Sequence, residues 1–134
     1  MRAKAEKIDM LVIREITEGL FAGRHDVLEP SDEAVSDRLL ITRATSEELF
    51  KIAFEQARAR RRTYGTPGQV TLLDKSNVLR GNAFMHKVFD EVARDYPDVG
   101  ADRLYIDAGA MMFVTNPERF NVVVTENVFG DVVS

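Results

Sequence analysis

Val70-Thr71-Leu72-Leu73-Asp74-Lys75-Ser76-Asn77 is the stretch of this 134-residue chain that most strongly predicts its fold. Four side chains suited to a strand interior end abruptly in an acid, an amine and an amide. A helix-like apolar pattern over residues 84–96 follows shortly afterwards. Open parallel α/β sheets bind their ligands where the end of a strand leads into a helix. The stretch therefore predicts such a sheet, with a functional site at its carboxyl edge.

Two later apolar runs also end in polar residues. Leu104-Tyr105-Ile106 ends at Asp107, and residues 122–125 continue into Glu126-Asn127-Val128-Phe129-Gly130-Asp131. The carboxyl ends of parallel strands meet along one edge of a sheet, so these side chains are expected to converge with Lys75. One shared site is the prediction.

The rest of the chain alternates strand and helix patterns. The expected elements are strands over 8–16, 39–43, 103–107 and 121–125, a helix over 45–62 that begins at the capping box Thr45-Ser46-Glu47-Glu48, and a short helix over 108–113. This spacing predicts one α/β domain over 1–134, with a mainly parallel sheet and flanking helices. Residues 24–37 are polar and aperiodic, which predicts a loop or a hairpin arm outside the core.

Composition narrows the class of protein. A hydrophobic fraction of 45% with 30% charged residues is typical of a soluble globular domain. The net charge of −4 argues against a general nucleic-acid surface, and no run reaches the ~18 apolar residues of a membrane span. Cysteine is absent, which removes disulfides and thiolate sites and fits a cytoplasmic protein. Neither nucleic acid nor membrane is an expected partner.

Two clusters allow more than one interpretation. Arg58 to Arg62 end a predicted helix, where cations complement the helix dipole, so a solvated helix end is favoured over a binding patch. The helix over 84–96 has an apolar face wide enough for either a subunit interface or the domain core; it comprises Phe84, Met85, Val88, Phe89 and Val92. His25 and His86 are assigned no role.

The polar strand ends carry a recognisable set of chemical groups. Lys75 can act as a base if its surroundings lower its pKa. Asp107 and Asp131, if brought together, would bind a hard divalent cation such as Mg²⁺ or Mn²⁺. Arg14 could grip a carboxylate with its planar fork. Each of these residues alone is more common as a cap or a surface charge, so the functional prediction rests on the joint pattern.

Five ordered blocks resemble the isocitrate/isopropylmalate dehydrogenase family, closest to its isopropylmalate and tartrate branches. They are LVIRE at 11–15, DKSNVL at 74–79, YPDV at 96–99, YIDA at 105–108 and TENVFGD at 125–131. The resemblance covers nearly the whole chain, but only the central, dimer-forming domain of the family. It implies oxidation of a 2-hydroxy acid by NAD or NADP with Mg²⁺ or Mn²⁺, usually followed by decarboxylation.

The resemblance also implies a role for each matching residue. Arg14 would bind a substrate carboxylate, Lys75 would assist proton removal from the hydroxyl, and Asn77 would lie near the nicotinamide. Asp107, which counts with Lys75 as catalytic, would hold the metal together with Asp131. In the family's homodimer the active sites are shared, so Lys75 and Asp107 would serve the partner's site. Arg14 and Asp131 would serve their own.

The chain also departs from the family pattern. Phe21 stands where members carry a tyrosine that acts as an acid after decarboxylation, and phenylalanine cannot donate a proton. The family's upstream substrate arginines, its final metal aspartate and its adenosine-binding domain have no match within these 134 residues, while residues 24–37 would match an arm exchanged between subunits. Two functions therefore stand side by side: the central part of a dehydrogenase, or an inactive dimerisation module or truncated remnant.

Overall fold

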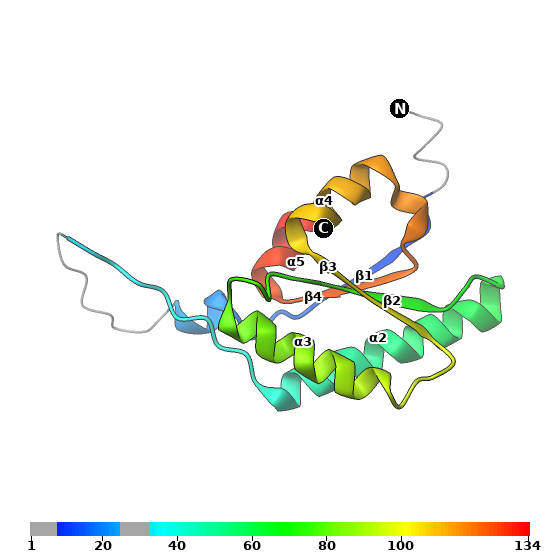
Figure 1. The fold of residues 1–134 in the computed structure, drawn as a ribbon, viewed down its shortest axis with the longest axis horizontal. Helices are drawn as coiled ribbons and strands as arrows, with labels where there is room; N and C mark the ends of the chain where they lie inside the picture. Colours follow the sequence, from blue (N-terminus) through cyan, green and yellow to red (C-terminus); the bar gives the residue numbers. More distant parts are fainter. Residues whose placement is uncertain (1–7, 25–32) are drawn as a thin grey trace.

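The computed structural model describes residues 8–24 and 33–134. Within these residues four strands form one sheet, in the order β1-β4-β2-β3 (Figure 1). The strands are β1 (Leu11–Arg14), β2 (Gln69–Asp74), β3 (Gly100–Tyr105) and β4 (Val122–Thr125). Every neighbouring pair is parallel. The predicted α/β fold with a mainly parallel sheet and flanking helices is confirmed.

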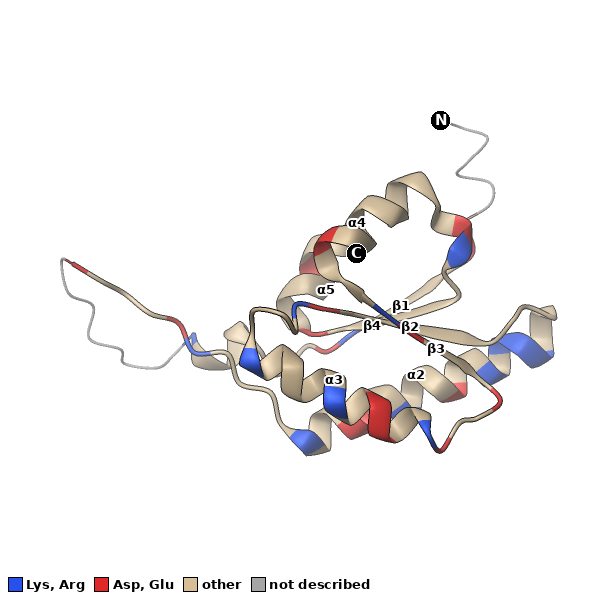
Figure 2. Cartoon of the chain, in the orientation of Figure 1, with Lys and Arg blue, Asp and Glu red and all other residues tan. Residues whose placement is uncertain are grey.

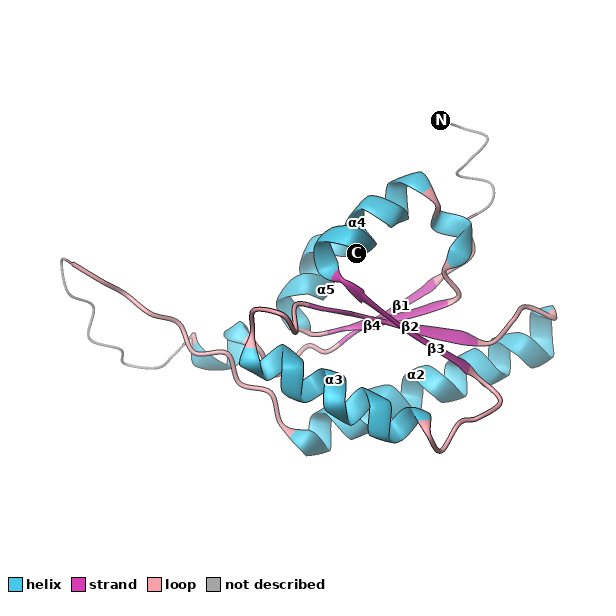
Figure 3. Ribbon diagram, viewed as in Figure 1, coloured by secondary structure: helices cyan, strands magenta, loops and turns pink. Residues whose placement is uncertain are grey.

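Helices cover both faces of the sheet (Figure 3). Helices α2 (Arg43–Tyr64) and α3 (Arg80–Ala93) lie on one face, and α4 (Ile106–Thr115) and α5 (Asn127–Val133) lie on the other. Successive strand residues therefore enter two different cores: Leu72 packs toward α2 and α3, whereas Leu73 packs in the second cluster with Phe120. Burial on both faces explains the continuous apolar run of β2.

The core between α2, α3 and the sheet is aromatic. The ring centroid of Phe89 lies 5.1 Å from that of Phe50 and 5.4 Å from that of Phe54. Met85, Val88, Phe89 and Val92 are all buried, so most of the wide apolar face of α3 is used inside the domain. Only its edge residue Phe84, 36% exposed, remains at the surface.

The predicted strand over 39–43 is wrong. Only an isolated antiparallel bridge joins Gly19 to Leu40 there, and Arg43 already belongs to α2. The predicted cap is wrong as well, because Thr42 is the N-cap residue and its hydroxyl accepts a hydrogen bond from the N–H of Thr45. Glu18 accounts for this shift, since its carboxylate accepts hydrogen bonds from both the N–H (2.8 Å) and the hydroxyl (2.6 Å) of Thr42.

Other boundaries move by a few residues. The strand expected over 8–16 is limited to Leu11–Arg14, because β4 offers only four partners. Helix α3 begins four residues before Phe84. The strand expected over 103–107 lies at Gly100–Tyr105, which places Asp107 in the first turn of α4 instead of at a strand end. Two 3₁₀ helices, Leu20–Gly23 and Pro117–Arg119, complete the regular structure of the described residues.

Of the two predicted surface features, the basic cluster can be located, whereas the arm can be followed only at its ends. Basic residues gather at the carboxyl end of α2 (Figure 2), where Arg58 pairs with Asp98 at 2.6 Å and Arg60 with Asp9 at 2.7 Å. Most of the predicted arm, residues 25–32, lies outside the described residues. The adjoining residues 33–38 are exposed and extend away from the sheet (Figure 1).

Candidate active site

The strand register brings the predicted site residues to one edge of the sheet. Arg14 pairs with Thr125, and Thr125 pairs with Leu73 of β2. Asp74, at the end of β2, pairs with Tyr105 at the end of β3. All four strands thus end together, and the polar residues that follow them share the carboxyl edge.

Lys75 and Asp107 meet at this edge. Lys75 follows β2 directly, and its Nζ lies 2.8 Å from Oδ1 of Asp107. The hydrogen bond from Lys75 lowers the pKa of the Asp107 carboxyl, and the backbone N–H groups that begin α4 lower this pKa further. The Asp107 side chain is 69% exposed, so its carboxylate stays accessible to a ligand.

Arg14 and Asp131 form a second ion pair at the same edge. Nη1 of Arg14 lies 2.6 Å from Oδ1 of Asp131. Its Nε and Nη2 donate to Oδ1 of Asn127 at 3.2 and 2.8 Å. A side chain on Gly130 would come within 2.5 Å of Cγ of Arg14, so glycine is required for α5 to approach β1 this closely. The ring of Phe21 lies 5.8 Å from the guanidinium carbon of Arg14.

Within one copy of the chain, the Lys75–Asp107 pair and the Arg14–Asp131 pair remain separate. Among the described residues no hydrogen bond or ion pair links Lys75 and Asp107 to Arg14 and Asp131. The described part of the chain likewise holds no group of three His, Asp or Glu side chains placed to bind a metal ion. Asn77 lies in an exposed turn between β2 and α3.

Buried acids fix the loops that carry the Arg14 pair. Glu15 accepts hydrogen bonds from the N–H of Thr17 at 2.6 Å and of Glu18 at 2.8 Å. Glu126, only 3% exposed, accepts from the N–H groups of Val128 and Phe129 and so caps α5. These contacts hold the segment that follows Arg14 and the first turn of α5, which includes Asn127.

His86 is the residue that sequence reasoning missed. Its Nδ1 lies 2.7 Å from Oδ2 of the buried Asp74, next to Lys75. The two residues are 12 positions apart, so the contact exists only because α3 packs back against the end of β2. The sequence did contain an indication of this contact. Asn82, His86 and Asp90 are spaced four residues apart, so their polar side chains lie on one face of α3.

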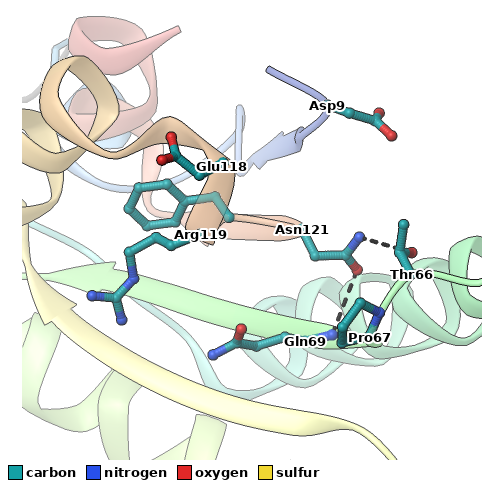
Figure 4. A pocket seen from close by; sticks show the side chains of 8 residues that line it. Asp9, Thr66, Pro67, Gln69, Glu118, Arg119 and Asn121 are labelled. Carbon is teal, nitrogen blue, oxygen red and sulfur yellow. Dashed lines mark hydrogen bonds between the residues drawn. The ribbon is translucent and has the colours of Figure 1, made fainter. Parts of the chain in front are cut away.

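A separate pocket lies at the opposite edge of the sheet (Figure 4). It has a volume of about 190 Å³ and includes residues at the amino ends of β2 and β4. Asn121 donates to Oγ1 of Thr66 at 3.3 Å and accepts from the N–H of Gln69 at 3.5 Å across it. None of the predicted site residues lines this pocket.

Of the described helices, none is both long and apolar enough to cross a membrane.

Known proteins are similar to this chain in sequence. The 3-isopropylmalate dehydrogenase of Carboxydothermus hydrogenoformans is 38% identical over 131 residues, which are 96% of this chain and 33% of that enzyme. The same enzyme of Listeria monocytogenes is 41% identical over 129 residues, 96% of this chain and 35% of that enzyme. This chain therefore spans about a third of the length of such relatives.

A solved structure and a family model agree with these relatives. The crystal structure of isocitrate dehydrogenase from Methylococcus capsulatus matches with a TM-score of 0.80 and 35% identity, covering 93% of this chain and 36% of that one. The sequence model of the isocitrate/isopropylmalate dehydrogenase family matches residues 1–134 of this chain. With its parallel sheet and the polar residues at its carboxyl edge, the chain belongs to the isocitrate/isopropylmalate dehydrogenase family.

Proposed function

We propose that this chain forms the central part of a dehydrogenase that oxidises, and usually decarboxylates, a 2-hydroxy acid such as 3-isopropylmalate or tartrate. Family membership and the relatives' names support the reaction class. The observation that carries the proposal is the contact between Lys75 and Asp107 at the carboxyl edge of the sheet. This edge is where parallel sheets bind ligands, and Arg14 lies on it as well.

Arg14 and Lys75 would act directly on the substrate. The guanidinium of Arg14 is partly exposed, and a substrate carboxylate would take the place of one of its present acceptors, Asn127 or Asp131. The Nζ of Lys75 would receive the hydroxyl proton as the substrate is oxidised. It can do so only after the amine, which donates to Asp107 in this contact, has left the contact and released a proton to solvent, so that its nitrogen offers a lone pair.

Asp107 and Asp131 would hold the metal ion. Both offer exposed carboxylate oxygens, the ligands that Mg²⁺ and Mn²⁺ prefer. Because the described residues of one copy provide no cluster of three such groups, the remaining ligands would come from another copy or from elsewhere in the protein. When bound, the metal would polarise the hydroxyl and NAD or NADP would accept the hydride. Asn77, in its exposed turn, would lie near the nicotinamide.

A homodimer would complete the site. Helix α4 is almost entirely uncharged along its length (Figure 2), with Asp107 as its one charged residue. It exposes Met111 (58%) and Val114 (69%). Val132 of α5, on the same face of the sheet, is 77% exposed. Exposed apolar side chains on helices of one face of the sheet support a subunit contact. In such a dimer Lys75 and Asp107 would reach the partner's site, and residues 24–37 would form the exchanged arm.

A chimera tests the proposal. The chain replaces the matching 129 residues of the Listeria monocytogenes enzyme, and NADH formation is followed with Mn²⁺ and a panel of 2-hydroxy acids. We expect the chimera to oxidise at least one of these acids. We expect this turnover to be lost when the chimera also carries Lys75→Met. The isolated chain is expected to show little or no turnover, since an incomplete site loses its positioning. A folded, dimeric chimera that oxidises none of the acids would contradict the proposal.

The second candidate function is an inactive dimerisation module. It is favoured by the exposed apolar side chains of Met111, Val114 and Val132, which can form a subunit contact without any catalytic group. Sedimentation of the isolated chain shows whether it is a dimer. Taken with the activity of the chimera, this result separates the two candidate functions. A dimeric chain within an inactive chimera would support the module, whereas an active chimera excludes it.

A further inference from the structure

Asp74 is a buried carboxylate next to the proposed catalytic lysine. It ends β2 and is 1% exposed. Its Oδ1 accepts a hydrogen bond from the N–H of Ser76 at 3.0 Å, and its Oδ2 lies 2.7 Å from Nδ1 of His86. A buried carboxylate is unfavourable unless it is paired and hydrogen-bonded. His86 supplies the side-chain partner that Asp74 needs.

Helix α3 holds the backbone around Lys75 at two points. Oδ1 of Asn82 accepts a hydrogen bond from the N–H of Lys75 at 2.8 Å. His86 lies one turn further along the same helix face and holds Asp74, which in turn holds the N–H of Ser76. The Lys75 carbonyl closes the turn by accepting from the N–H groups of Val78 and Leu79. The two contacts with α3 therefore fix the peptide on each side of Lys75.

His86 is itself held from the outer side. Oδ2 of Asp90, one turn on, lies 3.8 Å from its Nε2. Asp90 forms an ion pair with Arg103 of β3, whose guanidinium lies 5.1 Å from the ring of Phe89. A surface cavity of about 260 Å³ adjoins this row of charges; it is lined by Asp74, His86, Arg103, Leu104, Tyr105 and Ala108. The imidazole thus lies between two carboxylates from β2 and α3.

We propose that His86 is a positioning residue for Lys75. It acts through Asp74, whose carboxylate fixes the turn from which the lysine side chain extends. The catalytic part of this inference rests on the proposed function of Lys75, whereas the mechanical part rests on the contacts alone. Loss of His86 would leave Asp74 buried without its side-chain partner and would loosen the Ser76 N–H. Lys75 would then be less well aligned.

Amide hydrogen exchange of the 134-residue chain tests the mechanical part. His86→Leu removes the donor, and Lys87→Leu makes the same replacement at the next, exposed position of α3. Exchange of the Ser76 amide is expected to speed up by about tenfold in His86→Leu, since bonds to charged groups are among the stronger ones. It should not change in Lys87→Leu. Unchanged exchange in His86→Leu, in a variant that NMR shows to be folded, would overturn the inference.

The kinetic part is measured in the chimera. His86→Leu is expected to lower kcat by about tenfold and to leave KM nearly unchanged, because a positioning residue affects the alignment of Lys75 and not the binding of substrate. A change in KM alone would overturn the kinetic part. If the chimera without the His86 change is inactive, the proposed function fails instead, and the Ser76 amide still decides whether His86 positions the turn.

Discussion

At the scale of single residues, the carboxyl edge presents two ion pairs instead of one assembled site. Lys75 contacts Asp107 at 2.8 Å, and Arg14 contacts Asp131 at 2.6 Å. Exposed pairs of this kind add little to stability. Their carboxylates are therefore available to a ligand that binds them better than the neighbouring cation does.

Asp107 is expected to titrate below its ordinary pKa of 3.8, because it accepts a hydrogen bond from Lys75. A lowered pKa means that the contact stabilises the fold above about pH 4, and that this contribution is lost as the pH falls through the lowered value. In Lys75→Met the Asp107 pKa should rise. It should stay below 3.8, because the backbone N–H groups of Asp107 and Ala108 still lower it.

Carboxyl-carbon NMR of the isolated chain measures this titration. Lys87→Met serves as the control, since it removes an exposed lysine of α3. If the Asp107 carboxyl has the same pKa in Lys75→Met and in the unchanged chain, Lys75 and Asp107 are not paired in solution.

Phe21 is expected to limit any decarboxylation step. Its ring is 36% exposed and lies beside Arg14, so a hydroxyl added there would lie at the proposed substrate site. In the chimera, Phe21→Tyr should raise kcat by about tenfold or more, since a positioned acid contributes ~10²- to 10⁴-fold. NADH formation and release of the protonated product are followed. An unchanged kcat would indicate that water or another group already supplies the proton.

At the scale of elements, sequence patterns locate helices and strands better than their ends. The apolar run of β2 and the periodic faces of α2 and α3 were predicted, because both cores depend on side chains that are periodic along the chain. The start of α2 was not, because it depends on Glu18, a residue 24 positions before Thr42. The contact between His86 and Asp74 was missed for the same reason.

Thr42→Ala is expected to destabilise the chain by about 1–2 kcal/mol, the usual effect of removing an N-cap residue. Thr45→Ala should have a smaller effect of about 0.5–1 kcal/mol, because it removes only the hydroxyl that donates to Glu18 at 2.9 Å. Urea unfolding followed by circular dichroism compares the two. The assignment of Thr42 as the N-cap would be wrong if Thr45→Ala were the more destabilising change.

At the scale of the whole molecule, the sequence predicts the layers but not the assembled site. The segments that follow β2, β3 and β4 and carry Lys75, Asp107 and Asp131 do share one edge, as expected for a parallel sheet. The position of β4 between β1 and β2 could not be predicted, because it depends on long-range packing. Nor could a single chain show whether Asp107 and Asp131 would hold one metal ion, since the proposed arrangement needs a second copy.

Mixing two inactive chimeras tests this shared site most directly. Lys75→Met and Asp131→Asn are each expected to be inactive alone. If each site combines Asp131 of one subunit with Lys75 of the other, refolding them together in equal amounts gives mixed dimers with one intact site. About a quarter of the unmutated activity should return, because half of the dimers are mixed and half of their sites are intact. No recovery, in a mixture where mass spectrometry shows that mixed dimers have formed, would contradict the shared site.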